Sequence, residues 1–297
     1  MRAFFCFLLW TAATPGWAAL NIFACTPEWG ALAKELGGDK AAVYTATTAL
    51  QDPHRIEARP SLIARARSAD LMVCTGAELE VGWAPLVQRQ SGNPRIQAGR
   101  PGYFEAAGVV PLLDQPARLD RSMGDVHPAG NPHVHLDPRN VAKIAAALGE
   151  RMSALDAAEA QNYRARTTAF LQRWQDATRR WERQAAPLKG MPVVAYHKNL
   201  SYLFHWLGMR ETGALEPKPG LPPGTAHLGE LLEQLKRAPA KAVVRAAYNE
   251  PRAAEWLAER AGMPSVMLPY TVGGTDRAKD LFGLYEDTIA RLMQVAK

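Results

Sequence analysis

The hydrophobic and polar positions of the chain alternate between short apolar runs and longer amphipathic stretches. Short apolar runs predict strands, and stretches with apolar residues at helical spacing predict helices. Strands are predicted at 20–26, 43–50, 71–74, 191–196, 242–246 and 265–268. Helices are predicted at 27–36, 61–68, 79–90, 199–208, 226–237, 251–261 and 280–295. The short connections between strands and helices favour parallel sheets with helices on their faces.

Individual residues support several of these boundaries. Pro27 is suited to the first turn of a helix, and the glycine pair after Leu36 is suited to its end. Ser61 is predicted to cap the second helix. Pro85 falls inside the helix predicted at 79–90 and interrupts its pattern.

The middle of the chain has a different pattern. Residues 140–188 contain no strand signal and no proline until Pro187. With Asp156 as its cap, one helix of roughly 28 residues would extend about 42 Å. We therefore expect an α/β protein of two lobes, each a parallel-sheet sandwich, joined by a long rigid helix. The predicted divisions are 19–138 for the first lobe, 139–188 for the connecting helical segment and 189–297 for the second lobe.

Residues 1–18 have the layout of a cleaved secretory signal peptide. Met1 and Arg2 precede the apolar run 3–10, and Ala18 ends a small-residue cleavage sequence. The apolar run is far shorter than the roughly 20 residues that span a bilayer. Cys6 lies within this run and not after a lipidation sequence, which disfavours a lipid anchor. The pattern predicts an exported, soluble protein.

Composition and charge exclude several classes of protein. With 47% hydrophobic and 22% charged residues, the chain is typical of a globular protein and not of a disordered one. Its net charge of +6 comes from basic residues that are scattered along the sequence. The densest group, at 173–183, alternates with acidic residues on a helical pattern, as on a solvated helix face. We expect no nucleic-acid partner.

Two cysteines remain after the predicted cleavage. Cys25 and Cys74 each lie at the end of an apolar run that is predicted to form a strand. Neighbouring parallel strands lie about 4.8 Å apart, which is within disulfide range if the two ends are level. An exported protein permits a disulfide between them, and two buried free thiols are the alternative.

Three of the seven histidines lie where ligands bind in α/β proteins. His54 follows the strand predicted at 43–50, His197 follows the strand predicted at 191–196, and His133 lies just before the helical middle segment. Ligands of open α/β sheets bind beyond the carboxyl ends of strands. Because neutral imidazole is a common metal ligand, two facing lobes would form a metal site from these three side chains.

The other histidines have simpler interpretations. His205 lies in an apolar helical stretch and is expected to pack there, and His227 is expected at the surface near a helix start. His127 is interpreted as a loop residue or a peripheral metal contact. His135 is two residues from His133, so in an extended segment the two side chains point to opposite faces.

An ordered set of motifs resembles one protein family. The set comprises Pro27-Glu28-Trp29-Gly30, Asp52-Pro53-His54, Ala69-Asp70-Leu71, Gly76-Ala77-Glu78-Leu79, Asn131-Pro132-His133-Val134 and Leu136-Asp137-Pro138. In these motifs the mature chain resembles the periplasmic zinc- and manganese-binding solute-binding proteins of ABC importers. The resemblance implies two α/β lobes with a long connecting helix, which agrees with the pattern above.

The resemblance also implies a function. His54, His133 and His197 match the first three metal ligands of that family, and three imidazoles resemble its zinc-preferring branch, so Zn²⁺ is expected before Mn²⁺. The implied protein is a periplasmic monomer that captures the ion between its lobes and delivers it to the membrane permease of an ABC importer. It is not an enzyme.

The sequence departs from the family at the fourth ligand. The aspartate expected after the last strand falls near Val272, which offers no carboxylate. Water, His135, Asp276, Glu57 or Glu80 could complete the site, and we favour water slightly over Asp276, which the flexible Gly273-Gly274 would allow to reach back.

The alternative hypothesis is an exported zinc-dependent hydrolase. His133-x-His135, followed by His197, His227 and Asp276, mimics the ligand order of amidohydrolase barrels. Such a barrel needs roughly 250 residues, and its first strand would end at the His-x-His motif. Too few residues follow His133, and the strandless middle segment would interrupt the barrel.

Overall fold

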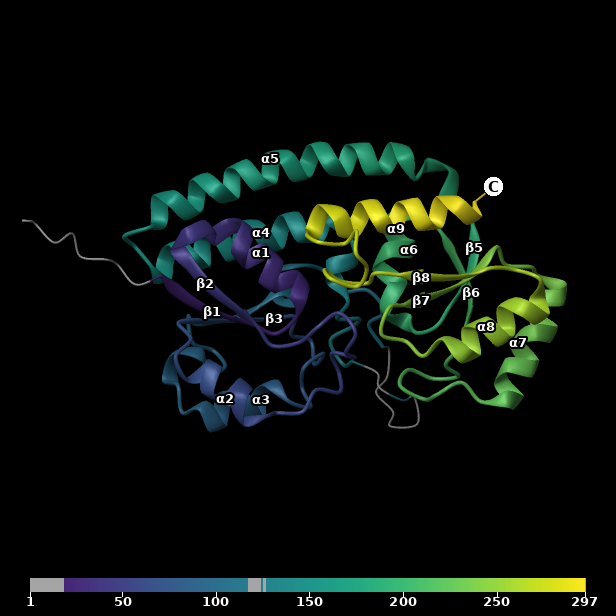
Figure 1. Cartoon of the computed structure of the whole chain (residues 1–297), viewed down its shortest axis with the longest axis horizontal. Helices are drawn as coiled ribbons and strands as arrows, with labels where there is room; N and C mark the ends of the chain where they lie inside the picture. The colour runs from purple at the N-terminus through teal and green to yellow at the C-terminus, as the bar shows by residue number, and fades with distance from the viewer. Residues whose placement is uncertain (1–18, 117–123, 125–126, 297) are drawn as a thin grey trace, which may run out of the picture.

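The computed structural model describes residues 19–116, 124 and 127–296. The signal peptide predicted over residues 1–18 lies outside these ranges. Two parallel sheets of four strands each lie side by side, one in each lobe, beneath a long helix that passes over both (Figure 1). Among the described residues, no helix combines the length and the apolar character needed to cross a membrane.

The two sheets have the same strand order. The N-terminal sheet has the order β2-β1-β3-β4 and the C-terminal sheet the order β6-β5-β7-β8, and every pairing is parallel. The strands are β1 (Leu20–Ala24), β2 (Ala41–Thr45), β3 (Leu71–Cys74), β4 (Tyr103–Glu105), β5 (Pro192–Ala195), β6 (Arg210–Ala214), β7 (Ala242–Ala246) and β8 (Ser265–Leu268). All carboxyl ends of one sheet therefore share one edge, where ligand sites form.

Helices cover both faces of each sheet. They are α1 (Pro27–Gly37), α2 (Pro60–Arg67), α3 (Ala84–Ser91), α4 (Pro138–Leu155), α5 (Ala160–Gln184), α6 (Ser201–Leu207), α7 (Thr225–Arg237), α8 (Pro251–Ala261) and α9 (Leu281–Val295). In the N-terminal lobe α1 and α4 lie on one face, and α2 and α3 on the other (Figure 1). In the C-terminal lobe α6 and α9 lie on one face, and α7 and α8 on the other.

One continuous hydrophobic core extends through both lobes under α5. Its aromatic centre lies between α5 and α9, where the ring of Tyr285 stacks on Trp181 with centroids 4.9 Å apart and meets Trp174 edge-on at 5.3 Å. Because all three side chains are almost fully buried, moving one lobe against the other on this side would expose apolar surface.

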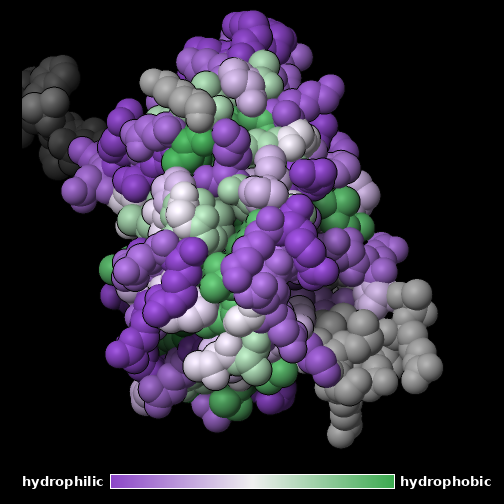
Figure 2. Space-filling view, turned by 90° about the vertical axis from the view of Figure 1, so that its right-hand side faces the viewer, coloured by the Kyte–Doolittle hydropathy of each residue, from purple (hydrophilic) through white to green (hydrophobic). Residues whose placement is uncertain are grey.

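The surface at the end of the molecule formed by the C-terminal sheet and its helices is covered mainly by hydrophilic residues (Figure 2).

The connecting segment is two helices and not one. Asp156, predicted to begin a helix of roughly 28 residues, instead ends α4, and its carboxylate accepts a hydrogen bond from the Tyr163 hydroxyl at 2.9 Å. The connection between the lobes is therefore α5, with 25 residues. Its buried face includes Tyr163 and Phe170, whereas Ala165 and Ala169 are exposed.

Several predicted boundaries were wrong for local reasons. The helix predicted at 79–90 begins only at Ala84, because Pro85 fits the first turn of a helix and not its interior. The second helix begins at Pro60, so Ser61 lies inside it and does not cap it. The strand predicted at 43–50 is β2, which ends at Thr45. Strands β4 and β6 were not predicted.

The two open sheets exclude the amidohydrolase barrel, which needs eight parallel strands closed on one axis. The predicted lobe boundaries of 19–138 and 189–297 stay a prediction. The two sheets lie on either side of the segment 139–188.

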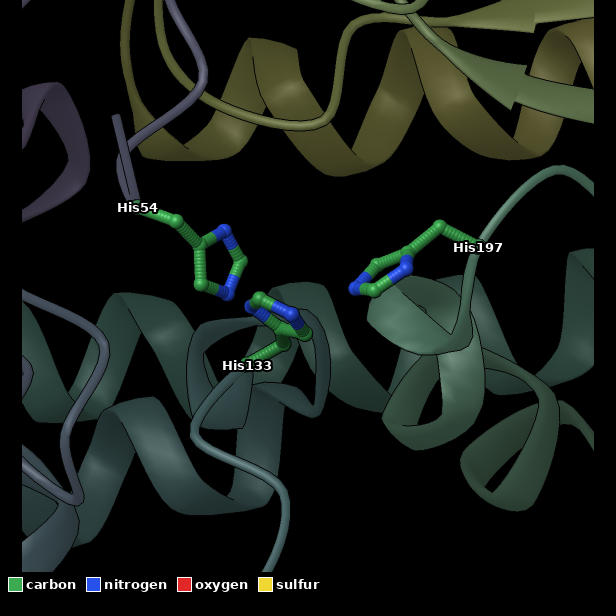
Figure 3. Close-up of side chains that lie close together, drawn as sticks. All are labelled: His54, His133 and His197. Atoms are coloured by element: carbon green, nitrogen blue, oxygen red, sulfur yellow. The ribbon is translucent and has the colours of Figure 1, made fainter. Parts of the chain in front are cut away.

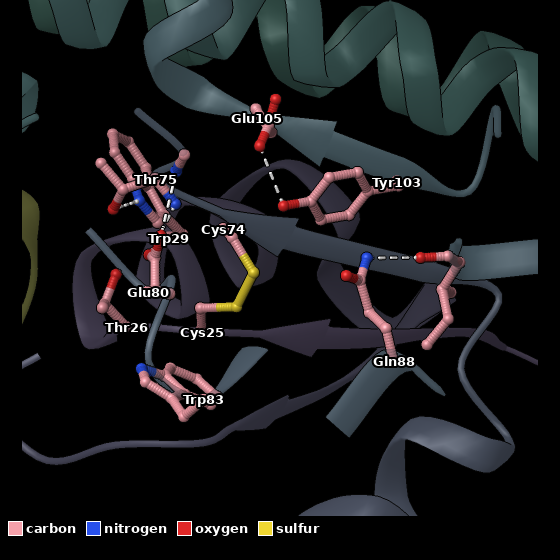
Figure 4. The surroundings of a disulfide bond; sticks show 12 residues. Cys25, Thr26, Trp29, Cys74, Thr75, Glu80, Trp83, Gln88, Tyr103 and Glu105 are labelled. Carbon is pink, nitrogen blue, oxygen red and sulfur yellow. Dashed lines mark hydrogen bonds between the residues drawn. A yellow bond between two sulfur atoms is a disulfide. The ribbon is translucent and has the colours of Figure 1, made fainter. Parts of the chain in front are cut away.

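Cys25 and Cys74 form a disulfide in the structure (Figure 4). The two residues follow β1 and end β3, which are neighbours in the sheet, and their Cα atoms are 4.8 Å apart. Beside the disulfide, the Trp29 indole donates a hydrogen bond of 2.9 Å to the hydroxyl of Thr75. The disulfide thus links the carboxyl ends of β1 and β3 covalently.

Candidate metal centre

Three histidines from three distant segments converge between the lobes. His54 lies in the loop after β2, His133 lies before α4, and His197 follows β5 by two residues. One ring nitrogen of each lies within 4.8 Å of the others, and the three rings point toward a common centre (Figure 3). Their ring centroids are 5.4–5.8 Å apart. The structure therefore brings together the three side chains that the sequence singled out.

Carboxylates fix the orientation of two of these rings. The Nδ1 atom of His54 lies 2.8 Å from Oδ1 of Asp52, and the Nδ1 atom of His197 lies 2.6 Å from Oε2 of Glu216. An ionised carboxylate only accepts hydrogen bonds, so each Nδ1 carries the ring proton. Each Nε2 atom then carries a lone pair and no proton, which is the state that a metal ion requires.

The third ring has a phenol as its partner. The Nδ1 atom of His133 lies 3.0 Å from the hydroxyl oxygen of Tyr270. Burial raises the pKa of Tyr270 well above its ordinary value, so the phenol stays neutral. When Nδ1 of His133 donates to this oxygen, its Nε2 atom is also free to bind a cation.

The electrostatics of the centre favour the neutral form of His133. Burial, followed by the neighbouring rings of His54 and His197, holds the pKa of His133 well below its ordinary value. Burial by itself raises the pKa of the Asp52 carboxyl, but the hydrogen bonds and charge of His54 outweigh it and lower that pKa. The site thus combines a neutral His133 ring with the ionised carboxylate of Asp52, which is hydrogen-bonded to His54.

Hydrogen bonds from the core hold the segments that carry the histidines. The side-chain oxygen of Asn131 accepts a bond of 3.0 Å from the backbone N–H of His133, and its amide donates 2.8 Å to the carbonyl of Lys198. The indole of the buried Trp83 donates 3.0 Å to the carbonyl of Pro53, just before His54. These contacts position the rings before any ion binds.

The two carboxyl-end loops also contact each other across the lobes. The Arg55 guanidinium donates 3.1 Å to the carbonyl of Gly220, and the backbone N–H of Gly220 donates 2.8 Å to Oε2 of Glu216. The loop that carries His54 is therefore connected to the acid that orients His197. A cavity of about 290 Å³ lies beside the centre and is lined in part by His127, His133 and His197.

His135 does not belong to this centre. Its ring is fully buried on the other side of the segment, where Nε2 donates 3.0 Å to the carbonyl of Tyr270 and Nδ1 lies 3.7 Å from Glu28. The divergence from His133 was predicted, but from an extended segment. Residues Val134–Leu136 form a turn of 3₁₀ helix, whose three-residue period also separates side chains two positions apart.

The other residues that were predicted to complete the site are also elsewhere. Asp276 is exposed and is not part of the group of converging donors, so the short reach through Gly273-Gly274 is not made. Glu57 is exposed as well. Glu80 is buried near the disulfide, where it accepts hydrogen bonds from the backbone N–H groups of Thr75 and Gly76.

Sequence reasoning missed the partners of the histidines. Asp52 lies two residues before His54, and an acid this close to a ligand was a usable signal. Glu216 is 19 residues from His197 and Tyr270 is 137 residues from His133, and neither lies near its histidine in the sequence. Only the packing of β6 and β8 beside the centre reveals them.

Comparison with known proteins decides the family. A family model described as the periplasmic zinc-uptake complex component A, ZnuA, matches residues 22–295. The chain belongs to this family. The fold agrees, since a crystal structure of ZnuA superposes with a TM-score of 0.74 at 19% identity, covering 92% of this chain and 99% of that one.

Curated relatives of this ZnuA-family chain match it in part. The zinc-binding lipoprotein AdcA of Streptococcus pneumoniae (strain ATCC BAA-255 / R6) is 22% identical over 208 residues, which are 69% of this chain and 40% of that protein. The zinc uptake protein ZnuA of Brucella abortus (strain 2308) is 25% identical over 120 residues, 40% of this chain and 36% of that protein. The chain thus spans about two fifths of the length of these relatives.

Proposed function

We propose that this protein is the substrate-binding component of an ABC-type zinc importer, which captures Zn²⁺ between its lobes. The observation that carries the proposal is the convergence of His54, His133 and His197, each with Nδ1 bonded to an oxygen and Nε2 directed inward. Carboxylate–histidine–zinc arrangements of this kind fix the ring and strengthen the ligand. Zinc accepts nitrogen donors in a tetrahedral shell.

The carboxylates also explain how a site of neutral ligands holds a divalent cation. A buried charge is costly unless it is paired. Asp52 and Glu216 supply two negative charges. Each carboxylate is hydrogen-bonded to Nδ1 of a ligand ring, on the side of the imidazole opposite the ion. Asp52 and Glu216 thus supply the negative charge that a carboxylate at position 272 would have supplied.

Membership of the family supports a wider role. We propose that the protein acts in the periplasm as a monomer, that it delivers zinc to the membrane permease of an importer, and that it has no catalytic role. The AdcA and ZnuA relatives are named for zinc binding and zinc uptake. Mn²⁺ is proposed as the weaker ligand, since it prefers oxygen donors.

A metal titration of the purified mature protein tests this function. After removal of metal with a chelator, Zn²⁺ should raise the apparent stability by about 2.7 kcal/mol at a hundredfold excess over Kd. Mn²⁺ at the same concentration should raise it less. If neither zinc nor any other first-row divalent metal shifts the thermal transition, the proposal is wrong.

A growth experiment tests the importer role separately. In the source organism, deletion of the coding sequence should slow growth in zinc-depleted medium, and added zinc should restore it. A deletion strain that accumulates zinc at the normal rate under depletion would contradict the role in import, even if the protein binds zinc.

A further inference from the structure

A tetrahedral zinc ion needs four donors, and the three converging histidines supply three. The Nε2 atom of His127 lies 3.3 Å from the Nε2 atom of His54. We infer that His127 is the fourth protein ligand of this site and a determinant of its metal specificity. The inference rests on the proposed function and assigns a residue that stood in the sequence only as a loop residue or a peripheral contact.

The geometry of the two nitrogens fits one shared ion. With Zn–N bonds of about 2.0–2.1 Å, two nitrogens of a tetrahedral site are separated by about 3.3–3.4 Å. The distance between the Nε2 atoms of His54 and His127 equals this edge. Imidazole centroids around such an ion lie about 5 Å apart. The His127 centroid is 5.4 Å from that of His54 and 6.4 Å from that of His133. Its ring nitrogens lie outside the group formed by the nitrogens of His54, His133 and His197, so the His127 ring moves inward when it completes the shell.

The proton positions favour the same interpretation. The Asp52 carboxylate holds the ring proton of His54 on Nδ1, so the atom that faces His127 is a lone pair. In the empty site His127 can satisfy this lone pair by donating from its own Nε2. When His127 carries its proton on Nδ1 instead, both Nε2 lone pairs point to the space between them, where a cation belongs.

The other residues considered for this position lie elsewhere. Val272 has no donor, Asp276 is exposed, and His135 is turned into the core. His127 also lines the cavity beside the centre together with His133 and His197. An ion that enters through this cavity would meet His127 beside the other histidines, and His127 would occupy its fourth coordination position.

A fourth imidazole changes what the site selects. Water or aspartate at this position would add an oxygen donor, which Mn²⁺ accepts readily, whereas four nitrogens favour Zn²⁺, Co²⁺, Ni²⁺ and Cu²⁺. The charges of Asp52 and Glu216 then balance the ion without an anionic ligand. His127 thus moves the preference of the site away from manganese.

The test compares the full mature protein with two variants, His127→Ala and His205→Ala. His205, which was expected to pack against the core, is instead exposed on α6 and is the matched control. Zinc affinity is measured by competition with a chromophoric chelator, manganese affinity by competition with zinc, and the number and geometry of ligands by the visible absorption of bound Co²⁺. Four-coordinate Co²⁺ absorbs strongly, and higher coordination weakens the bands.

The inference predicts that His127→Ala lowers zinc affinity about 100-fold or more, since even outer partners of metal ligands contribute about 10–100-fold. It also predicts a smaller loss for Mn²⁺, a changed Co²⁺ spectrum, and no change in His205→Ala. If His127 only bonds to His54 in the empty site, the Co²⁺ spectrum stays the same in His127→Ala and the inference is wrong. If even the unaltered protein binds no zinc, the proposed function fails, and the inference fails with it.

Discussion

His133 and His135 are two residues apart and have opposite environments. The His133 ring faces the space between the lobes, where its Nε2 atom meets two other imidazoles. The His135 ring is fully buried among Trp29, Tyr270 and Glu28. A single residue connects the two, because Tyr270 places its hydroxyl on His133 and its carbonyl on His135.

This contrast shows that residue type alone does not make a ligand. Both histidines are buried and both have one nitrogen bonded to Tyr270. They differ in what surrounds the second nitrogen. The second nitrogen of His133 faces the rings of His54 and His197. That of His135 faces Glu28, whose carboxylate already accepts hydrogen bonds from the hydroxyls of Thr26 and Thr271. We therefore expect His133 to control metal binding and His135 to control the stability of the fold.

The largest effect is expected on zinc affinity when His133 is removed. His133→Ala should lower zinc affinity by about 100-fold or more, because the ion loses an inner donor and partners of ligands alone contribute about 10–100-fold. Chelator competition measures the loss. His135→Ala is the matched control and should stay within about tenfold of the unaltered protein. Equal losses in the two variants would remove the distinction between the two sides.

On the core side the expected effect is on stability. His135→Ala should lower the free energy of unfolding by about 1–3 kcal/mol, because the Tyr270 carbonyl loses its buried donor and a cavity remains. Urea denaturation of the metal-free protein measures the change. A metal-free variant as stable as the unaltered protein would show that the buried ring contributes nothing to the fold.

Tyr270→Phe separates the two contacts of Tyr270. The substitution removes the hydroxyl bonded to His133 and keeps the carbonyl that serves His135. Zinc affinity should fall about tenfold, as for the loss of an outer partner of a ligand. A matched Tyr248→Phe variant, which alters a neighbouring tyrosine bonded to Asn199, should leave the affinity unchanged. A loss of the same size in both would point to a general disturbance of the cleft.

The smallest effect is expected on the stability of the metal-free protein at low pH. Burial and the neighbouring histidines lower the folded-state pKa of His133 below that of the unfolded chain, near 6.5. Below about pH 6.5 the unfolded state therefore binds the extra proton, and the metal-free protein should lose stability as the pH falls toward the folded-state pKa. His133→Gln should reduce this loss, and His205→Gln should not. An identical pH dependence in all three proteins would assign the loss to other groups.

Much of the fold was predictable because the signals act over a few residues. β3, β7, β8 and α8 occur where the apolar pattern placed them, and the glycine after α8 ends it in a left-handed conformation. The missed strand β4 has only three residues, and β6 ends in Gly213 and Ala214, so neither has an apolar run to detect. Pro85 marked a boundary correctly but at the start of a helix and not within one.

The sequence by itself determined the class of fold, the alternation of strands and helices, and three histidines placed at the carboxyl ends of the two sheets or just before α4. Periodicity, proline and glycine constrain the backbone locally, so these features can be read without a structure. The tertiary structure alone decided that His54 meets His127, that Glu216 orients His197, and that His135 turns into the core. These pairings join residues up to 135 positions apart, and no local pattern encodes them, because they arise only when distant strands pair within each sheet and when the core under α5 brings the two lobes together.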